Sequence, residues 1–194
     1  MARIATNLQP RSHPFMNYRH SYHAGNFADV LKHIVLVLCL DYLQRKEGGL
    51  CILDTHGGAG LYDLASEEAQ KTGEWTRGVG CLNVTSPVQE VPVDLALYLD
   101  LIRPDLQRNL YPGSPLIIAR MLRPQDRLIV AELHEPTFLA LETAINPYKS
   151  ARALFMDAYE CARANLPPKE RRGLVLIDPP FEEKDEFEKL ANQM

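Results

Sequence analysis

The sequence predicts an α/β protein with a buried parallel sheet of the Rossmann-like, nucleotide-binding type. Three observations predict it: four short apolar segments recur along the chain, each leads to a carboxylate, and the first breaks into a glycine-rich loop. Strands that are apolar along nearly their whole length are typical of parallel sheets covered on both faces by helices. The four segments are residues 50–60, 127–134, 151–158 and 173–181.

The composition is that of a soluble globular protein. The 194 residues include 21 Lys and Arg and 25 Asp and Glu, so the formal net charge is −4, and 46% of the residues are hydrophobic. These values exclude a disordered or collagen-like chain and suit one domain. The charge balance does not indicate a nucleic-acid-binding protein, although residues 1–33 are locally basic, with Asp29 as their single acid.

The cysteines and the apolar runs indicate the cellular context. The four cysteines lack zinc-type spacing, so we expect reduced thiols in a cytoplasmic protein. The longest apolar run, Ile34–Leu40, is far too short to cross a membrane, and residues 1–17 lack the apolar core of a secretory signal. We expect residues 1–17 to be a flexible extension and residues 18–194 to form the domain.

Local signals place helices around the predicted strands. Asn26 is a suitable N-cap for a helix, and helical patterns recur at 137–145 and 158–166. The segment 61–109 is too long for a simple crossover, so we expect an inserted, largely helical subdomain there. Ser114 is expected to cap the next helix, which has a proline at its first position.

The carboxylates that follow the four strands are the main evidence for a site. They are Asp54, Glu132, Asp157 and Asp178. Ligands of open α/β sheets bind beyond the carboxyl ends of the strands, so four acids at these ends predict a binding site. Glu132 can accept hydrogen bonds from both ribose hydroxyls of an adenosine-containing ligand. The alternative is a helix-capping or surface acid.

The glycine-rich loop, Asp54–Gly60, lets a ligand approach the backbone closely. It is neither a P-loop nor a complete dinucleotide fingerprint, because no Lys-Ser/Thr pair follows the last glycine and the glycine spacing differs. The loop therefore has two interpretations, a cofactor contact or a tight turn between a strand and a helix.

The tetrapeptide Asp178-Pro179-Pro180-Phe181 is the most informative motif. Two prolines fix the backbone at the strand end, so Asp178 and a proline carbonyl can each accept a hydrogen bond from an exocyclic amine. Phe181 can stack on a planar ring. Holding both N–H groups favours the pyramidal nitrogen that forms during methyl transfer. The alternative is a proline-rich strand exit without chemistry.

The histidines do not predict a metal site, because their positions have no recognised ligand spacing. His33 falls within the first predicted helix. A partly buried histidine with one hydrogen bond explains it as well as a binding role does.

Five motifs in this order resemble one known family. The stretch 18–33 reads YRHSYHAGNFADVLKH, and LDTHGGAG, YPGSP, AELHE and LIDPPF follow it. Together they closely resemble the bacterial ribosomal RNA large-subunit methyltransferase J family. The resemblance implies a class I S-adenosylmethionine-dependent methyltransferase fold with an inserted helical subdomain. It also implies N6-methylation of one adenine in large-subunit (23S) ribosomal RNA.

The resemblance assigns roles by motif position. Asp178 would be the catalytic residue. Contacts to S-adenosylmethionine are implied for His33, His56, Ser114, Glu132, Asp157 and Ala158. The target base or RNA would lie near Tyr18, His20, Lys32, Pro179, Pro180 and Phe181. Large-subunit ribosomal RNA is the expected partner, with no membrane and no metal.

This chain departs from the family pattern in three ways. Phe181 stands where the family usually has Tyr, and His56 is followed by Gly57-Gly58 where the family usually reads His-Ala-Gly. The family's members also continue past the position of Met194, so we expect an incomplete sheet whose fourth strand lies at an edge; a full-length chain is expected to be a monomer. The alternatives are a truncated non-catalytic remnant, a methyltransferase acting on DNA or protein amides, and a nicotinamide oxidoreductase.

Overall fold

The protein contains a four-stranded parallel sheet, as the sequence predicts. The computed structural model describes residues 19–82, 92–180, 188 and 191, so the expected extension 1–17 lies outside the described residues. The sheet has the order β5-β4-β1-β6 and every pairing is parallel. Its strands are β1 (Cys51–Asp54), β4 (Arg127–Glu132), β5 (Ala151–Phe155) and β6 (Gly173–Leu176).

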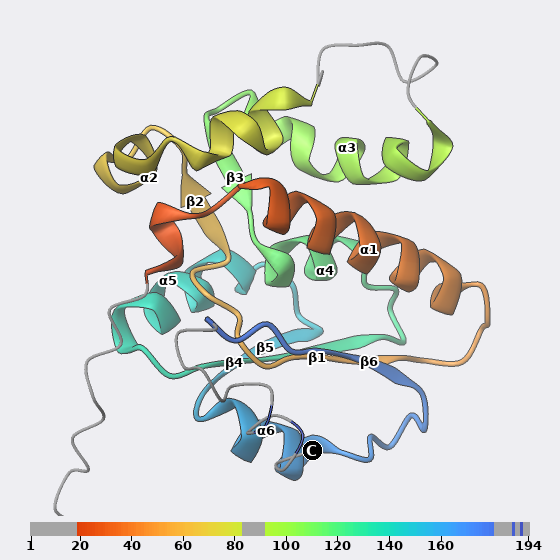
Figure 1. The fold of residues 1–194 in the computed structure, drawn as a ribbon. Helices are drawn as coiled ribbons and strands as arrows, with labels where there is room; N and C mark the ends of the chain where they lie inside the picture. Colours follow the sequence, from red (N-terminus) through yellow and green to blue (C-terminus); the bar gives the residue numbers. More distant parts are fainter. Residues whose placement is uncertain (1–18, 83–91, 181–187, 189–190, 192–194) are drawn as a thin grey trace, which may run out of the picture.

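Helices cover both faces of this sheet (Figure 1). Three lie on one face: α1 (Phe27–Gln44), α4 (Ser114–Met121) and α5 (Glu135–Ile145). On the other face lies α6 (Ala158–Asn165). The predicted α/β fold class is therefore confirmed.

Successive residues of the strands enter opposite cores, which explains why the strands are apolar throughout. In β1, Ile52 packs with Leu40 of α1 and Leu141 of α5. Its neighbour Leu53 packs on the other face with Cys161 of α6. Each strand position is thus dictated by burial, and the register of the sheet follows from it.

Residues 61–82 and 92–109 form much of a separate layer over α1 (Figure 1). Its helices are α2 (Glu67–Thr72) and α3 (Val93–Leu106), with short 3₁₀ turns at Glu74–Arg77 and Val79–Cys81. Helices and 3₁₀ turns predominate in the described part of the segment. The layer also contains two short strands that the sequence did not predict, β2 (Leu61–Asp63) and β3 (Leu110–Pro112), which pair antiparallel.

The caps of the helices agree with the sequence in one case and not in another. Asn26 caps α1 by accepting a hydrogen bond from the backbone N–H of Asp29. The expectation that Ser114 caps α4 is wrong, because Gly113 precedes this helix and Ser114 is its first residue. The Ser114 hydroxyl instead donates to Asp54, as described below.

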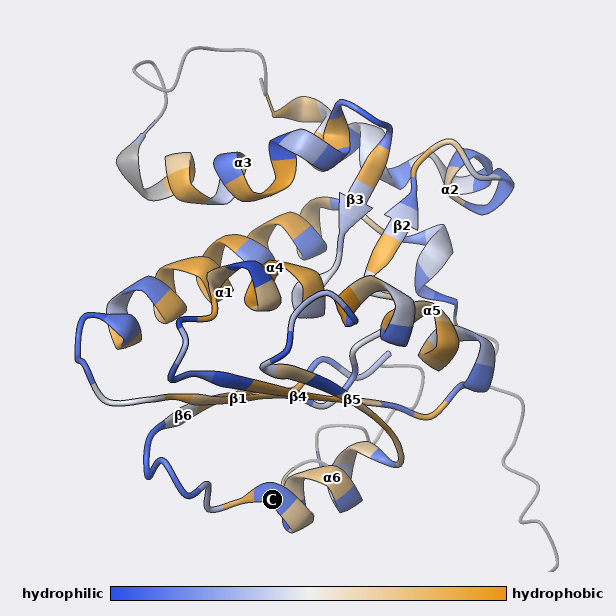
Figure 2. Ribbon diagram, turned by 180° about the vertical axis from the view of Figure 1, so that it is seen from behind, coloured by the Kyte–Doolittle hydropathy of each residue, from blue (hydrophilic) through white to orange (hydrophobic). Residues whose placement is uncertain are grey.

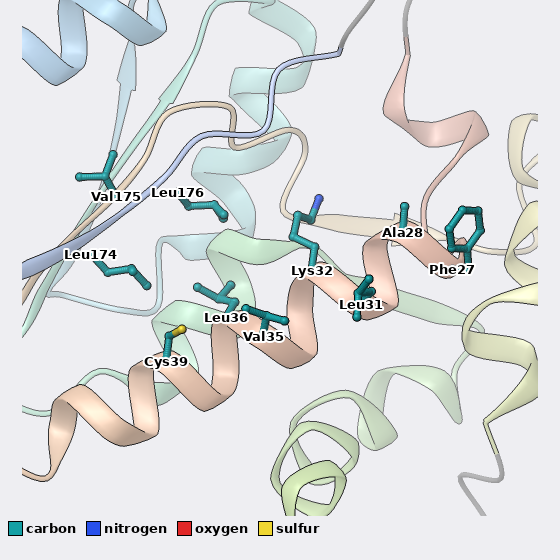
Figure 3. Close-up of a pocket in the computed structure, with 10 residues that line it drawn as sticks. All are labelled: Phe27, Ala28, Leu31, Lys32, Val35, Leu36, Cys39, Leu174, Val175 and Leu176. Carbon is teal, nitrogen blue, oxygen red and sulfur yellow. The ribbon is translucent and has the colours of Figure 1, made fainter. Parts of the chain in front are cut away.

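Strand β6 lies at an edge of the described sheet, as expected, and α1 exposes apolar residues beside it. Phe27 is 72% exposed and Leu31 is 62% exposed. Figure 2 shows hydrophobic residues along most of α1. Figure 3 shows the groove of about 380 Å³ that this helix face forms with Leu174, Val175 and Leu176 of β6.

Candidate methyltransferase site

The carboxyl ends of the four strands meet at one edge of the sheet, and the predicted acids lie there. Asp54 and Glu132 are the last residues of β1 and β4, while Asp157 and Asp178 each follow their strand by two residues. Strand β1 has β4 on one side and β6 on the other. The strand order reverses at this point, which is where open α/β sheets bind ligands.

Asp54 is fully buried and holds the loop that follows β1. Its Oδ2 accepts a hydrogen bond of 2.6 Å from the Ser114 hydroxyl, and its Oδ1 accepts one of 3.3 Å from the backbone N–H of His56. Burial raises the pKa of Asp54 to about 6, although the Ser114 bond opposes this shift. Asp54 is therefore a buried residue that fixes the loop after β1 and the start of α4, and it does not face a ligand directly.

The glycine-rich loop packs tightly against β4. A Cβ on Gly57 would lie 2.1 Å from Val130 Cγ1, so a larger residue at this position would displace β4 or the loop. The backbone N–H of Gly57 donates to the carbonyl of Ala131, and that of Gly58 donates to Glu132 Oε2 at 3.0 Å. The loop is thus fixed beside the end of β4.

Glu132 is held by backbone donors on both of its oxygens. Besides the Gly58 bond, its Oε1 accepts a hydrogen bond of 2.8 Å from the backbone N–H of His134. Each carboxylate oxygen can accept a second hydrogen bond, so Glu132 retains capacity for a ligand with hydroxyl groups. The side chain is half-buried, and its two backbone donors fix its position at the end of β4.

Asp157 and Ala158 form the entrance to α6. Asp157 Oδ1 accepts hydrogen bonds from the backbone N–H groups of Tyr159 and Glu160 and so caps the helix. Both bonds use Oδ1, which leaves Oδ2 available for a ligand. Ala158 is buried at the first position of the helix.

His56 lies on the glycine-rich loop that follows β1. Burial lowers its pKa and outweighs the nearby charges of Asp178 and Asp157, which act in the opposite direction. Its Nδ1 is 2.9 Å from the hydroxyl of Thr55. His56 is therefore a neutral imidazole on the glycine-rich loop, within range of the charges of Asp157 and Asp178.

His33 is buried in the layer between α1 and β3, with 1% of its surface exposed. Its Nδ1 is 2.8 Å from the hydroxyl of Tyr111, and burial lowers its pKa to about 3. The other ring nitrogen, Nε2, is buried and finds no hydrogen-bond partner in the described part of the chain. A buried nitrogen without a partner is costly, so this atom is a candidate contact for a ligand.

Lys32 links α1 to the end of β6 across the widest sequence gap in the site. Its Nζ donates to Asp178 Oδ2 at 2.6 Å and to Asp29 Oδ1 at 2.8 Å. Asp29 Oδ2 is in turn 2.9 Å from His20 Nε2. We call these four side chains, His20, Asp29, Lys32 and Asp178, the Lys32 network.

Asp29 is the buried member of this network, His20 and Lys32 are half-buried, and Asp178 is the most exposed. Burial alone would lower the pKa of Lys32, but the charges of Asp29 and Asp178 raise it well above its usual value. Burial would likewise raise the pKa of Asp29, but His20 and the neighbouring charges hold it well below its usual value. Asp178 has 37% of its side chain exposed, so a substrate can reach it.

The structure brings one group of the residues implied by the resemblance together around Asp178. His20 and Lys32 join Asp178, while Pro179 is buried and Pro180 half-buried after it. The implied residues Tyr18 and Phe181 lie outside the described residues. Sequence reasoning missed the role of Asp29, although its position three residues before Lys32 on one helix was a usable signal.

Across residues 19–82 and 92–180, no group of three or more His, Cys, Asp or Glu side chains is placed to hold a metal ion. Among the helices described, none is long and apolar enough to cross a membrane.

The fold and the strand-end acids are those of an open α/β protein with a ligand site at the carboxyl ends of its parallel strands. The sequence model of the family described as "Ribosomal RNA large subunit methyltransferase D, RlmJ" matches residues 47–194. The chain belongs to this family, which confirms the resemblance.

Named relatives and a solved structure agree with the family. The chain is 45% identical to Ribosomal RNA large subunit methyltransferase J of Haemophilus influenzae over 177 residues, covering 89% of this chain and 62% of that protein. It is 40% identical to the protein of the same name from Escherichia coli over 180 residues, covering 91% and 63%. The chain therefore spans under two thirds of the length of these relatives.

The crystal structure of protein LPL1258 from Legionella pneumophila has the same fold. The TM-score is 0.76 at 35% identity, and the match covers 88% of this chain and 63% of that chain.

Proposed function

We propose that this chain binds S-adenosylmethionine and transfers its methyl group to N6 of an adenine in large-subunit ribosomal RNA. One observation carries the proposal. Asp178, Pro179 and Pro180 follow β6 at the switch point of the sheet, and Lys32 holds one oxygen of Asp178 there. The names of the relatives support the ribosomal RNA substrate.

The residues at the ends of β4 and β5 fit an adenosine-containing cofactor. Glu132 offers acceptors for ribose hydroxyls, and Asp157 Oδ2 offers one for the adenine amine. The unpartnered Nε2 of His33 is a further polar contact. S-adenosylmethionine, when bound, supplies an electrophilic methyl group. His56 and Ser114 would complete its surroundings, with Ala158 beneath.

The residues of β6 and α1 would hold the acceptor amine. Lys32 occupies Asp178 Oδ2, so Oδ1 is left to accept a hydrogen bond from the amine of an unstacked adenine. The carbonyl of Pro179 would accept the second N–H. An aryl amine is a poor nucleophile because its lone pair is delocalised into the ring, and these two acceptors favour its pyramidal form. After transfer the extra proton leaves to Asp178 or to water.

Calorimetric titration with S-adenosylhomocysteine tests the cofactor assignment. The sample is the 194-residue chain, with circular dichroism to establish folding and NAD as the competing ligand. Binding of S-adenosylhomocysteine without binding of NAD is the expected result. A folded chain that binds neither ligand would overturn the cofactor assignment, and one that binds NAD would favour a nicotinamide oxidoreductase.

Transfer of labelled methyl groups tests the substrate. Unmodified large-subunit ribosomal RNA, duplex DNA and a protein mixture are offered separately, and the product nucleosides are identified by mass spectrometry. We expect N6-methyladenine in the RNA. Transfer to DNA or protein would replace the RNA assignment, and a chain that binds cofactor without any transfer would be a non-catalytic remnant.

A further inference from the structure

Asp29 has more contacts than its place on the helix requires. It is the third residue of α1 and only 3% exposed. Its Oδ2 accepts a hydrogen bond from the backbone N–H of Gly25 and lies 2.9 Å from His20 Nε2. Its Oδ1 accepts a hydrogen bond of 2.8 Å from Lys32 Nζ. One buried carboxylate thus joins the start of the helix to two polar side chains.

These contacts serve two different purposes. The Gly25 bond to Oδ2 and the bond from the Asp29 backbone N–H to Asn26 secure the helix N-terminus, as in a capping box. The Lys32 bond to Oδ1 contributes nothing to that cap. A neutral acceptor would serve the cap alone at a smaller cost, because burying a charge is unfavourable unless the charge is paired.

The partner of Oδ1 is the residue that holds Asp178. Lys32 Nζ lies 2.8 Å from Asp29 and 2.6 Å from Asp178, between a buried and a half-exposed carboxylate. A lysine has a long stem with several rotatable bonds and no planar fork to fix its direction. With Asp178 alone as partner, the ammonium could follow that exposed side chain. With Asp29 as a second, buried partner, its position is fixed from the helix.

We propose that Asp29 is a positioning residue for methyl transfer: it fixes Lys32, and with it His20, so that Lys32 binds Asp178 Oδ2 and leaves Oδ1 open to the acceptor amine. This inference rests on the proposed function of the site and deepens it. The raised pKa of Lys32 and the lowered pKa of Asp29 agree with a tight pair.

The first experiment uses the Asp29→Asn variant of the 194-residue chain. Asparagine has the same shape and can still accept the Gly25 bond, but it removes the charge that holds Lys32. We expect kcat for methyl transfer to fall about 10²-fold, the cost typical of a small misplacement near the reacting atoms, with KM for the cofactor unchanged. The matched control is Asn26→Ala, which removes the cap but leaves the Lys32 network intact. It should lower thermal stability and preserve kcat.

The second experiment does not depend on turnover. The ammonium group of Lys32 is followed by ¹H–¹⁵N NMR, with the signal assigned through a Lys32→Met variant. In Asp178→Asn the signal should persist, because Asp29 still holds the group, whereas in Asp29→Asn it should broaden or disappear. Asp178→Asn changes a half-exposed side chain, so this measurement remains informative if the Asp29 variant does not fold.

The outcomes separate the inference from the function. A wild-type chain that transfers no methyl group would defeat the proposed function, and the NMR comparison would still decide the role of Asp29. Loss of the Lys32 signal in Asp178→Asn would overturn the positioning role. An unchanged kcat in Asp29→Asn would overturn it too, as would equal losses of kcat in Asp29→Asn and Asn26→Ala, because they would reveal a purely structural residue.

Discussion

Strands β4 and β6 flank the central strand β1 on opposite sides and differ sharply in burial. In β4, Leu128, Val130 and Ala131 are at most 1% exposed. The residues of β6 are half-buried or exposed, and its outer edge has no neighbouring strand in the described sheet. We call the half of the site on β1, β4 and β5 the cofactor side, and the half on β6 and the start of α1 the acceptor side.

The two sides position their acids in different ways. Glu132 on the cofactor side is held by two backbone N–H groups. One belongs to His134, two residues further along the chain, and the other to Gly58 in the loop after β1. Asp178 on the acceptor side is held by the ammonium of Lys32, which is 146 residues away. The difference teaches that the cofactor side is fixed by the sheet and its loops, whereas the acceptor side depends on one ion pair between distant segments.

The largest effect is expected from Asp178→Ala, which removes the central group of the acceptor side. Methyl transfer should fall by about 10²- to 10⁴-fold, the usual contribution of a positioned acid or base. Binding of S-adenosylhomocysteine, measured by calorimetry, should change little because Glu132 and Asp157 are untouched. Asp41→Ala, a half-exposed acid on α1 that pairs with Arg45 away from the site, is the control and should retain activity. Full activity in Asp178→Ala would refute the division into two sides.

The difference in burial between the two sides of β1 can be tested with two leucines of α1, one packed on the sheet and one beside β6. Leu40 is fully buried against the sheet, whereas Leu31 is 62% exposed on the face beside β6. Leu40→Ala should lower the free energy of unfolding by about 2–5 kcal/mol because it leaves a cavity. Leu31→Ala should change it by no more than about 0.5 kcal/mol. Urea denaturation measures both, and a large loss in Leu31→Ala would show that the outer face of α1 is packed in solution.

Titration of Asp54 on the cofactor side makes the free energy of unfolding depend on pH. Its pKa is raised from 3.8 to about 6 by burial, so the folded chain binds more protons than the unfolded chain in this range. The contribution of the protonated Asp54 carboxyl to the free energy of unfolding is therefore complete below pH 3.8. It is lost as the pH rises through about 6. At about 1.4 kcal/mol per pH unit the loss amounts to roughly 3 kcal/mol.

Comparison with Asp54→Asn isolates this contribution. Between pH 4 and 6 the free energy of unfolding of the variant should rise relative to that of the wild type, because asparagine does not titrate. Titration of His33, whose pKa is lowered to about 3, acts in the opposite direction but cancels in the difference. A difference that stays constant with pH would mean that the Asp54 carboxyl is not buried in solution.

The sequence predicted the sheet well because burial decides the pattern of its strands. All four predicted strands exist, and the edge position of β6 follows from their order. Strands β2 and β3 were missed because three residues are too few for a two-residue period to stand out. Ser114 was mistaken for a cap because its real partner, Asp54, is 60 residues away.

The site was predictable as a set of residue types and not as a set of contacts. The four strand-end acids predicted a ligand site at the carboxyl edge of the sheet, yet Asp54 is fully buried in the interior. The pairing of Lys32 with Asp178 depends on how α1 packs beside β6, which no local pattern encodes. The contact of Asp29 with Lys32 was missed because an acid in the first turn of a helix is already explained by the helix dipole.

The smallest effect is expected from Glu132→Ala on the cofactor side. Its backbone contacts keep the loop in place, but Gly57 is also bound to Ala131, so the loop should survive the change. Loss of a hydrogen bond to a charged acceptor should weaken binding of S-adenosylhomocysteine about 10-fold or somewhat more. Glu142→Ala, an exposed acid on α5, serves as the control in the same titration. Unchanged affinity in Glu132→Ala would remove the ribose contact and shift the cofactor toward Asp157 and His33.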